Sequence, residues 1–494
     1  MFDKVLIANR GEIAVRIIRT CRDMSIKTVA LYEAHDRGSL HVRLADECVE
    51  LKSSRGYLDG EAVLKVALDV GANAIHPGYG FLAERLDFIA ACEDAGIVFI
   101  GPPLAVMHSL HDKIDVLNRV RANGYATTNH SFVSFGENDL EALRAEAHRM
   151  GYPIVIKSCQ GGRGRGLKLA VTPDQLAVAV RRAQAEAQII YGDRRVYVER
   201  LIEPSHLIAV QIVGDAAGHI IHLGEREGSL QRGNQKFIEE SPAPCLFQAQ
   251  REQVWQQAIE IARLFNYQSV GTVEFIVDGS GQFFFTEIKP RIQIEHPVTE
   301  MVSSIDLVRE QIRVAAAEPL SITRAAVQLR GHAISCRISA EDPLNNFLPT
   351  PGHLRRVRLP GGPHVRVDTY VYSGCDVPAE YDPIVAKVCV WGEDRDECVL
   401  RLRRALEDFA LIGTPTNLPV HLRILSDPDF VNGDYTTDFF QHLPFDQPPA
   451  NAPLRDLAIA AAIAYVRRNL VFQPSLPDRL RTGWHRSSRH LPGV

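Results

Sequence analysis

Two glutamates in the middle of the chain stand where a charged side chain is costly. Glu274 lies inside the apolar run 271–277, and Glu287 lies inside the apolar run 283–288. A carboxylate in such surroundings needs a partner or a metal ion, and Mg²⁺ that bridges nucleotide phosphates is usually held by one or two carboxylates. A strand face open to water is the plainer explanation, but the flanking residues are too hydrophobic for it. We interpret the pair as a site for Mg²⁺ and nucleotide phosphates.

Three polar residues follow this pair at alternate positions. Arg291, Gln293 and Glu295 are separated by Ile292 and Ile294. In an extended segment, residues two apart point to the same side. We therefore expect one polar face next to the glutamate pair, with both isoleucines on the opposite face.

A glycine-rich loop, 160–166, separates two predicted strands, 153–157 and 167–171. Walker loops and dinucleotide-binding loops lead into a helix, whereas this loop leads into a strand. The pattern predicts a hairpin flap in a small lid that closes over a nucleotide. Lys157 ends the strand before the loop. With Lys113 it is a candidate phosphate contact, although a single lysine is more often a surface residue.

A further predicted strand, 196–202, leads out of the lid. Its backbone groups and Glu199 could contact the edge of an adenine ring. Each of these signals is weak by itself, and it is their order along the chain that favours nucleotide binding.

The pattern of predicted strands and helices that must position these residues changes along the chain. In the first hundred residues, short apolar strands alternate with helical patterns, which is typical of an open, doubly wound parallel sheet. The expected strands are 4–8, 28–32, 74–76 and 97–100, with a helix that begins at Gly11. The turn 76–80 follows a strand, at the end of the sheet where open α/β folds form their ligand crevices.

Beyond this sheet we expect mixed α+β structure. Residues 205–315 resemble antiparallel strands with one helix near 248–266, and the two glutamate strands form a hairpin. A further α+β block covers 330–440. A linker, 445–449, precedes a helix over 453–470.

Composition excludes several classes of protein. The chain has 494 residues, 46% of them hydrophobic, and a formal net charge of −5. These values fit a globular enzyme of about three domains and give no basic field for nucleic acid. No apolar run is long enough to cross a membrane, and the N-terminus does not resemble a signal peptide. The nine cysteines include no C-x-x-C pair, so we expect a reducing cytoplasm and neither a disulfide framework nor a zinc site.

Several longer motifs carry a resemblance to a known family. They are 7–14 (IANRGEIA), 76–82 (HPGYGFL), 151–153 (GYP) and 291–300 (RIQIEHPVTE), with shorter matches at 235–236, 336–338, 340–343 and 381–382. In these motifs the chain resembles biotin carboxylase, the ATP-grasp subunit or domain of biotin-dependent carboxylases, from residue 1 to about residue 443. Other ATP-grasp ligases would share only the lid and the two glutamates.

The resemblance implies ATP-dependent carboxylation of biotin by bicarbonate, through carboxyphosphate. Glu274 and Glu287 would hold Mg²⁺ or Mn²⁺. The implied ATP contacts are Lys113, Lys157, Gly161, Gly162, Gly164, Glu199, Arg200, Ile202, Gln231, Glu274 and Glu287.

The resemblance also implies roles on the bicarbonate and biotin side. The implied bicarbonate ligands are Arg291, Gln293 and the backbone of Ile294. Glu295 would deprotonate bicarbonate, Lys236 would steady the phosphate end, and Arg337 would stabilise the biotin enolate. The implied catalytic residues are therefore Arg291, Glu295, Lys236 and Arg337.

The chain departs from the family's pattern at nucleotide-side positions. Lys289 stands where the family usually has an Asn that helps to bind a second Mg²⁺, and an ammonium group would repel that cation. Asn234 replaces a usual His, and Arg163 stands within the glycine loop. A further family His aligns with Leu207, unless a shift of one residue brings in His206.

These departures leave two main interpretations open. One is a working enzyme with unusual nucleotide handling, which we favour, and the other is a catalytically impaired scaffold or regulatory subunit. A different ATP-grasp ligase, such as a carbamoyl-phosphate or amino-acid ligase, is a third alternative. The complete bicarbonate and biotin set, including Arg337, argues against it.

The resemblance divides the chain into domains. We expect a biotin carboxylase N-terminal domain at 1–110, an ATP-grasp domain at 111–315 with a mobile lid over about 129–201, and a C-terminal α+β domain at 330–443. A basic helical tail, 450–494, follows. The last 44 residues hold seven Arg and two Asp, and the tail either packs on its own domain or docks other subunits, with Trp484 as an anchor.

The expected partners are other polypeptides. Carrier proteins attach biotin to a lysine in an Ala-Met-Lys-Met type of motif, and none of the five methionines here adjoins a lysine. We therefore expect a separate biotin carboxyl carrier protein and separate carboxyltransferase subunits, and the resemblance implies a homodimer. The assembly would be an acetyl-CoA carboxylase of fatty acid biosynthesis, or a propionyl-CoA or pyruvate carboxylase. No nucleic acid and no membrane partner is expected.

Overall fold

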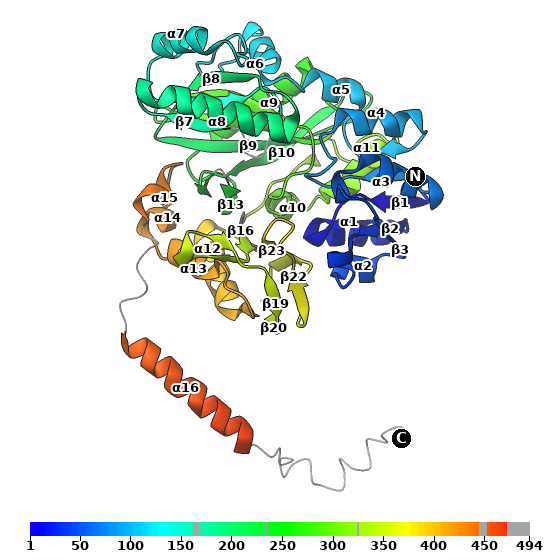
Figure 1. Cartoon of the computed structure of the whole chain (residues 1–494), viewed down its shortest axis with the longest axis vertical. Coiled ribbons are helices and arrows are strands. Elements are labelled where there is room, and N and C mark those ends of the chain that lie inside the picture. The colour runs from blue at the N-terminus through cyan, green and yellow to red at the C-terminus, as the bar shows by residue number, and fades with distance from the viewer. Residues whose placement is uncertain (162–166, 234, 324–325, 444–451, 472–494) are drawn as a thin grey trace. The chain divides into compact units, whose positions relative to one another are not determined.

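The computed structural model describes residues 1–161, 167–233, 235–323, 326–443 and 452–471, with the side chains of 457–467 in the last range. The chain forms two compact units, Met1–Phe445 and Asp446–Val494. The first unit holds every β-strand of the described residues and is shown in Figure 1.

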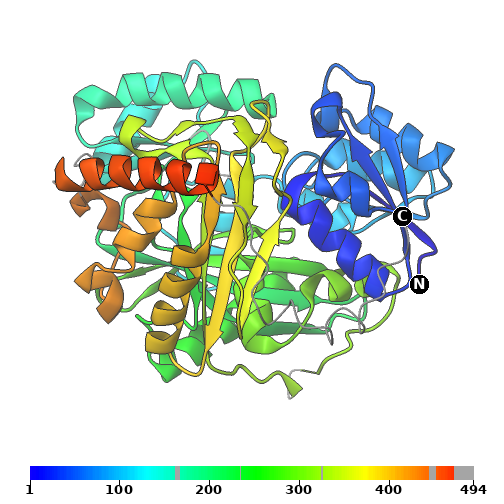
Figure 2. The same cartoon turned by 90° about the horizontal axis from the view of Figure 1, so that it is seen from below.

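The N-terminal part of the first unit is a parallel sheet of order β3-β2-β1-β4-β5. Its strands are β1 (Lys4–Ile7), β2 (Lys27–Tyr32), β3 (Glu47–Glu50), β4 (Ala74–His76) and β5 (Val98–Phe99), and its helices are α1 (Gly11–Asp23), α2 (Leu40–Leu44), α3 (Gly60–Asp69), α4 (Leu86–Asp94) and α5 (Leu104–Ser109). Val5 and Ile7 pack with α1, whereas Leu6 and Ala8 pack with α3 and α4, because successive strand residues point to opposite faces. The predicted doubly wound parallel sheet is confirmed, and Figure 2 shows it in blue beside the rest of the unit.

The lid is a small α+β body with its own core. Its antiparallel sheet has the order β7-β6-β8, with β6 (Ile154–Ser158), β7 (Lys168–Ala170) and β8 (Val196–Arg200). Ile154 and Ile156 on one face pack against α7 (Leu140–Met150) and α8 (Pro173–Tyr191), which leaves Val155 and Lys157 on the other face, toward a cleft. β6 and β7 pair across the glycine loop, so the predicted hairpin is confirmed. Residues 162–166 of that loop, including Gly162, Arg163 and Gly164, lie outside the described residues.

Eight antiparallel strands form the central sheet, in the order β15-β14-β9-β10-β13-β16-β23-β21. They are β9 (Ser205–Gly214), β10 (Ile220–Glu227), β13 (Ile238–Ser241), β14 (Ser269–Asp278), β15 (Phe283–Lys289), β16 (His332–Ser339), β21 (Val365–Thr369) and β23 (Ile384–Gly392). β14 and β15 form the predicted glutamate hairpin. β13 pairs with β16, so a single sheet runs from this hairpin into the C-terminal block. Helices α6 (Lys113–Ala122) and α9 (Gln248–Leu264) pack on the part with β9 and β14.

Two helices follow the glutamate hairpin where the sequence pattern predicts strands. α10 spans His296–Ser303 and α11 spans Leu307–Ala315, so the expectation of a single helix between 205 and 315 is wrong. Pro297 occupies the first turn of α10, where its missing N–H costs nothing. The Asp306 side chain caps α11 by accepting from the Arg309 N–H.

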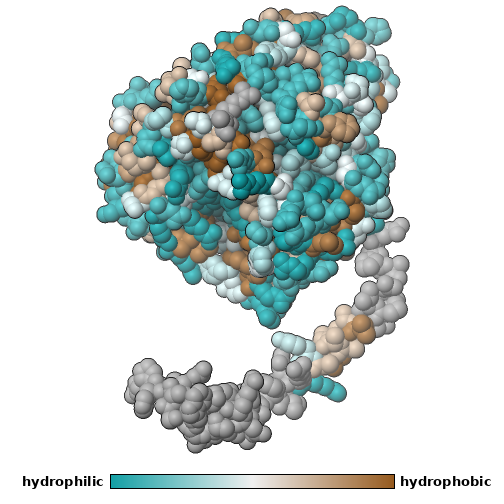
Figure 3. Space-filling model, turned by 180° about the vertical axis from the view of Figure 1, so that it is seen from behind, coloured by the Kyte–Doolittle hydropathy of each residue, from teal (hydrophilic) through white to brown (hydrophobic). Residues whose placement is uncertain are grey.

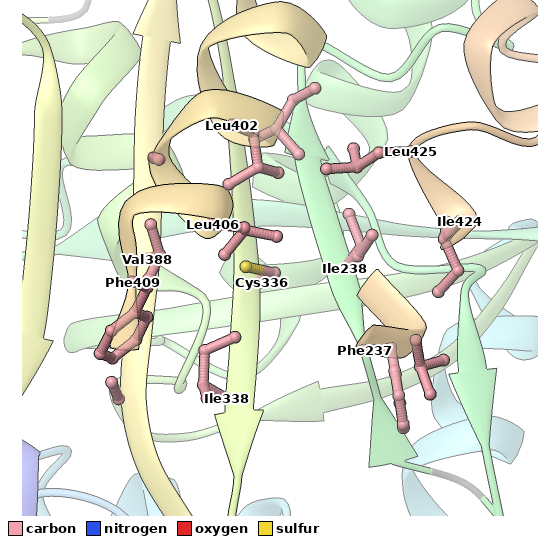
Figure 4. Close-up of a cluster of buried hydrophobic side chains, with 14 of the residues drawn as sticks. Phe237, Ile238, Cys336, Ile338, Val388, Leu402, Leu406, Phe409, Ile424 and Leu425 are labelled. Carbon is pink, nitrogen blue, oxygen red and sulfur yellow. The ribbon is translucent and has the colours of Figure 1, made fainter. Parts of the chain in front are cut away.

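The C-terminal block buries its core between the central sheet and several helices. Figure 4 shows Ile238 of β13, Cys336 of β16 and Val388 of β23 facing side chains of α12 (Arg395–Asp408) and α13 (Leu418–Ile424). The shorter elements of the unit are β11 (Gln231–Arg232), β12 (Gln235–Lys236), β17 (Glu341–Asp342), β18 (Leu348–Pro349), β19 (Gly352–Leu354), β20 (Arg356–Arg358), β22 (Cys375–Val377), β24 (Ala410–Ile412), α14 (Pro428–Asn432) and α15 (Phe439–His442). The predicted α+β character of this region is confirmed.

The second unit contains the helix α16 (Ala452–Val471), where the sequence predicts one. Its described apolar side chains are exposed, and Figure 3 shows tan and brown residues along this helix. They are Leu457, Ile459, Ile463, Tyr465 and Val466. None of the helices in the described part of the chain is long and apolar enough to span a bilayer.

Candidate nucleotide and anion site

A cleft of about 880 Å³ lies among the lid, the central sheet and the loop after β1. This volume is in the range of pockets that hold a nucleotide-sized ligand. The predicted site residues that line it are Lys157, Glu199, Arg200, Ile202, Gln231, Lys236, Glu274, Glu287, Lys289, Arg291, Gln293, Ile294, Glu295 and Arg337. Lys113 contacts Glu287 beside the cleft, and Gly161 is not among the lining residues.

The glutamate pair lies on neighbouring strands in direct register. Glu274 of β14 is the partner of Glu287 of β15, and residues opposite each other on an antiparallel pair project from the same face. Glu274 is only 5% exposed, which excludes the strand face open to water. Its Oε1 accepts from Lys236 Nζ at 3.1 Å and from Gln293 Nε2 at 3.0 Å. Burial by itself would raise the pKa of Glu274, but Lys236 and Lys289 outweigh it and lower that pKa.

Glu287 is held between two ammonium groups. Lys113 Nζ lies 3.3 Å from its Oε2, and Lys289 Nζ lies 2.6 Å from its Oε1. Burial opposes ionisation, yet Lys113 and Lys289 lower the pKa of Glu287 far below its ordinary value. Both carboxylates are therefore ionised, which is the state that a divalent cation requires.

The segment after β15 is not a regular strand, because the backbone bends at Arg291, whose N–H donates to the Lys289 carbonyl at 2.9 Å. Ile292 is fully buried opposite Arg291 and Gln293, as predicted. At Glu295 the backbone has φ −78° and ψ 4° and begins the turn into α10, so Ile294 lines the cleft and does not lie on the opposite face. The expected alternation is wrong at Ile294, because the chain has already left the extended conformation there.

The polar groups of this segment are fixed by residues from distant parts of the chain. Arg291 Nε donates to Glu84 Oε1 at 2.6 Å. Gln293 Oε1 accepts from Arg226 Nη2 at 2.8 Å, which turns the amide nitrogen of Gln293 toward Glu274. Lys387 Nζ donates to the Ile294 carbonyl at 3.2 Å.

Glu295 lies between two cations. Lys236 Nζ donates to its Oε1 at 2.5 Å, and Arg337 Nη2 donates to its Oε2 at 3.1 Å. Burial works in the opposite direction, but Lys236 and Arg337 hold the pKa of Glu295 well below its ordinary value. Arg337 also donates to Glu239, so its guanidinium is oriented from both sides.

The lid presents one uncommitted acceptor to the cleft. Lys157 Nζ donates to Glu199 Oε2 at 2.6 Å. The Oε1 of Glu199 is buried and accepts no hydrogen bond from the described residues. A donor such as the amino group of adenine would satisfy this oxygen, because a buried acceptor without a partner is costly.

Strand pleating decides between the two residues that could replace the family histidine. Leu207 lines the cleft, whereas His206 does not. His206 points to the other face of β9, where its Nδ1 lies 2.6 Å from Glu227 Oε1. A shift of one residue therefore does not bring a histidine into the cleft.

Sequence reasoning missed several residues of this site. They are Glu84, Arg226, Glu239, Glu341 and Lys387. Glu239 lies in the buried strand β13, but in the sequence it stands beside Glu240 and Ser241, so it lacks the apolar flanks that identified Glu274. Glu84 shows no signal in the sequence, because its partner Arg291 lies 207 residues away. In the cleft, burial and the nearby Asp382 raise the pKa of Glu341 to about 7.

The donor set of the cleft suits a magnesium nucleotide. Two ionised carboxylates offer the oxygen ligands that Mg²⁺ prefers, and it usually binds through one or two carboxylates and substrate phosphates. Lys113, Lys157 and Lys236 place positive charge around the same point. The residues present therefore fit both the ion and the phosphates.

Three protein-family models match successive parts of the first unit. Residues 1–107 match "Biotin carboxylase, N-terminal domain", residues 112–323 match "Carbamoyl-phosphate synthase L chain, ATP binding domain", and residues 335–442 match "Biotin carboxylase C-terminal domain".

Individual relatives cover most of the chain. Biotin carboxylase of Nostoc sp. is 45% identical over 445 residues, which are 90% of this chain and 99% of that protein. The propionyl-CoA carboxylase alpha chain of Ruegeria pomeroyi is 40% identical over 493 residues, 95% of this chain and 72% of that protein. Among solved structures, the biotin carboxylase domain dimer of Hydrogenobacter thermophilus 2-oxoglutarate carboxylase, in complex with MgADP, ADP and bicarbonate, matches with a TM-score of 0.88 and 39% identity, over 91% of this chain and 99% of that one. This chain belongs to the biotin carboxylase family.

Proposed function

We propose that this protein carboxylates biotin on a separate carrier protein, using bicarbonate and ATP through carboxyphosphate. The observation that carries the proposal is the position of Lys236. Its ammonium group contacts Glu274 of the metal pair and Glu295 of the anion segment. The phosphate site and the anion site are thus a single continuous site, as a transfer of phosphate to bicarbonate requires.

On the nucleotide side of the site, charged residues bind the metal ion and the phosphates. Glu274 and Glu287 would hold Mg²⁺ or Mn²⁺, which supplies neutralising charge to the phosphates when bound. Lys113 and Lys157 bind phosphate oxygens, and Lys236 holds the transferred phosphate. The further proposed ATP contacts are Gly161, Gly162, Gly164, Glu199, Arg200, Ile202 and Gln231.

On the bicarbonate side of the site, the residues that bind the anion are held in fixed orientations. Arg291 and Gln293 bind bicarbonate with the backbone of Ile294, and their partners Glu84 and Arg226 hold them in place. Glu295 takes the proton from bicarbonate, whose oxygen then attacks the γ-phosphate as ADP leaves. Carboxyphosphate breaks down to carbon dioxide and phosphate, and the phosphate takes the ureido N–H proton of biotin. Arg337 stabilises the resulting enolate, which attacks the carbon dioxide.

Glu295 becomes a better base as the substrates bind. With Lys236 and Arg337 both on its oxygens, its pKa lies well below its ordinary value, which makes it a weaker base. Phosphate draws Lys236 away, and the biotin ureido oxygen draws Arg337 away. Each loss of a neighbouring positive charge raises the pKa of Glu295, so proton removal follows the arrival of the other reactants.

The proposal also includes the partners of this protein and its domain boundaries. We propose a biotin carboxyl carrier protein and carboxyltransferase subunits as partners. We also propose a homodimer, which the biotin carboxylase domain dimer of Hydrogenobacter thermophilus supports. All nine cysteines are free, which supports a reducing cytoplasm.

The divisions 1–110, 111–315 and 330–443 are supported by the family matches, and the tail 450–494 is proposed to dock other subunits.

Release of ADP tests the function directly. Purified full-length chain is assayed with Mg²⁺, bicarbonate and free biotin, each omitted in turn. Release that requires all three supports a working biotin carboxylase. No release, even with a carrier and partner subunits present, would favour the catalytically impaired scaffold instead.

A further inference from the structure

Three potential metal ligands lie together outside the cleft, on the other face of β9. They are His206 near the start of β9, Glu227 at the end of β10 and Cys245 in the loop before α9. One nitrogen of His206, one carboxylate oxygen of Glu227 and the sulfur of Cys245 all lie within 4.8 Å of one another. The three residues come from separate elements, and no short sequence motif joins them.

Glu227 is a buried carboxylate with no arginine or lysine in ion-pair contact among the described residues. Its side chain is 0% exposed. Its Oε1 accepts from Ser229 Oγ at 2.8 Å and faces His206 Nδ1 at 2.6 Å. Its Oε2 accepts no N–H or O–H hydrogen bond within the described part of the chain. The His206 pair supplies charge only when the imidazole is protonated, so the site has room for a further positive charge.

The neighbouring Glu240 is a buried carboxylate whose negative charge is fully compensated. It is equally buried, and it accepts from Arg395 Nε at 2.8 Å and from Arg395 Nη2 at 3.1 Å. Tyr435 Oη donates to it at 2.6 Å as well. An arginine is always charged, whereas Glu227 has among the described residues only a histidine within ion-pair distance.

We propose that His206, Glu227 and Cys245 bind one Zn²⁺ ion. Imidazole nitrogen, thiolate sulfur and carboxylate oxygen are the ligands that Zn²⁺ takes in proteins, and three protein ligands leave a fourth position for water. Mg²⁺ prefers oxygen ligands alone, so the site discriminates against the ion that serves the cleft. A tetrahedral ion holds its ligand atoms about 3.5 Å apart. His206 Nδ1 and Glu227 Oε1, now 2.6 Å apart, would therefore separate to admit the ion, and the Cys245 sulfur, within 4.8 Å of them, would complete the set.

Binding exchanges protons for the metal. Burial and the adjacent Glu227 carboxylate raise the pKa of the Cys245 thiol, so the thiol keeps its proton while the site is empty. The ion displaces that proton, and any proton on the ligating nitrogen of His206, into solvent. His206 and Cys245 are both partly exposed, which gives the ion a path from water.

The site connects to the wall of the cleft. Ser229 Oγ donates to Glu227 and accepts from the backbone N–H of Leu207 at 2.9 Å. Leu207 lines the cleft. A bound ion would thus tie β9, β10 and the loop before α9 together directly behind the nucleotide. The absence of C-x-x-C pairs excludes only zinc sites of that spacing.

Cobalt is the probe for the test. Full-length chain is stripped with a chelator and titrated with Co²⁺ in millimolar Mg²⁺, which keeps the oxygen sites filled. We expect one equivalent of Co²⁺ bound with a thiolate-to-cobalt charge-transfer band. Cys245→Ser removes the band, and Cys245→Ser and His206→Gln each weaken binding by about 100-fold or more. Ser229→Ala weakens it by about tenfold, because it positions Glu227.

The matched control is Cys48→Ser, which removes an exposed cysteine on β3 and is expected to leave the band unchanged. Circular dichroism of the metal-free variants checks that they fold. Lack of the band in the wild-type chain overturns the proposal, and so does a band that survives in Cys245→Ser. If Cys245→Ser does not fold, an unchanged Co²⁺ affinity in His206→Gln overturns it instead.

Discussion

The ammonium group of Lys289 lies 2.6 Å from Oε1 of Glu287, two residues before it on β15. A cation of the protein thus already contacts one of the two carboxylates proposed to hold a divalent cation. Lys289 is 8% exposed, so water screens its charge little. This arrangement reduces the number of divalent ions that the pair can accept and makes Lys289 part of the charge that faces the phosphates.

Replacement of Lys289 is expected to tighten metal binding. In Lys289→Met the competing charge is removed, and we expect Mn²⁺ affinity in the presence of ADP to rise by about tenfold or more. Lys289→Asn removes the same charge and adds an oxygen ligand, so a second bound Mn²⁺ is expected only there. Electron paramagnetic resonance of Mn²⁺ measures both quantities. Lys168→Met, on the lid, is the control, and weaker binding in Lys289→Met would show that Lys289 holds Glu287 in place.

Loss of the base at Glu295 is expected to stop chemistry but not nucleotide binding. Glu295→Gln keeps the size of the side chain and loses the proton acceptor, so kcat for ADP release is expected to fall by about 10²–10⁴-fold. Affinity for MgADP, measured by calorimetry, stays within about threefold because Glu295 contacts no phosphate in the proposed site. Glu252→Gln on α9 is the control. Retention of a tenth or more of the wild-type rate would remove Glu295 from the base role.

The free oxygen of Glu199 predicts a contact to the base of the nucleotide. In Glu199→Gln a charged acceptor becomes a neutral one, and we expect KM for ATP to rise by roughly 10-fold or more. The value of kcat is expected to change much less, because the proposed contact of Glu199 Oε1 is to the adenine and not to the transferred phosphate. Steady-state kinetics with ATP as the varied substrate separate the two effects. An unchanged KM would mean that Oε1 meets no donor on ATP.

Buried neutral histidines are expected to make the first unit less stable in mild acid. Burial lowers the pKa of His76 to about 3 and the pKa values of His41 and His421 to about 4. Their unfolded-state pKa is about 6.5. Between these values the unfolded chain binds protons that the folded chain does not, so stability falls as pH drops from about 6.5 toward 4. At pH 5 each histidine costs on the order of 1–2 kcal/mol.

Thermal unfolding between pH 7 and pH 5 checks this prediction. In His41→Gln the loss of Tm over that interval is expected to be smaller than in the wild type by a few degrees. His35→Gln, at a half-exposed position, serves as the control and keeps the wild-type loss. Equal losses in wild type and His41→Gln would show that His41 is not neutral in the folded chain.

The exposed apolar face of α16 predicts a contact to another subunit. Ile459 and Ile463 are 51% and 52% exposed and one helical turn apart. In full-length chain with Ile459→Asp and Ile463→Asp, ADP release is expected to stay unchanged while co-purification of partner subunits falls. Ala461→Asp, on the opposite side of the helix between Leu457 and Tyr465, tests whether the contact is confined to the side of Ile459 and Ile463. Undiminished co-purification in the double variant would exclude docking through this face.

Local patterns were enough to predict much of the fold and the centre of the site. A carboxylate within an apolar strand needs a partner, and a few neighbouring residues are enough to recognise this, as at Glu274 and Glu287. A glycine loop between strands likewise predicts a hairpin without reference to distant residues. By contrast, β3 shows no apolar run because it is an exposed edge strand, and α10 was missed because its short apolar segment also suits a strand. In α11 the buried Leu307, Val308 and Ile312 do follow helical spacing, so the sequence offered a signal there that was overlooked.

Tertiary structure alone decided which distant groups meet. Arg291 and Glu84 are 207 residues apart, and Arg337 and Glu239 are 98 apart. Nothing within either segment indicates its partner. The choice between Leu207 and His206 depended on the pleat of β9, since adjacent residues of a strand face opposite sides. The same pleat brings His206 to Glu227 and Cys245. Periodicity is a property of a few consecutive residues, whereas these contacts depend on how eight strands are ordered and registered in one sheet, and that is why only the folded chain reveals them.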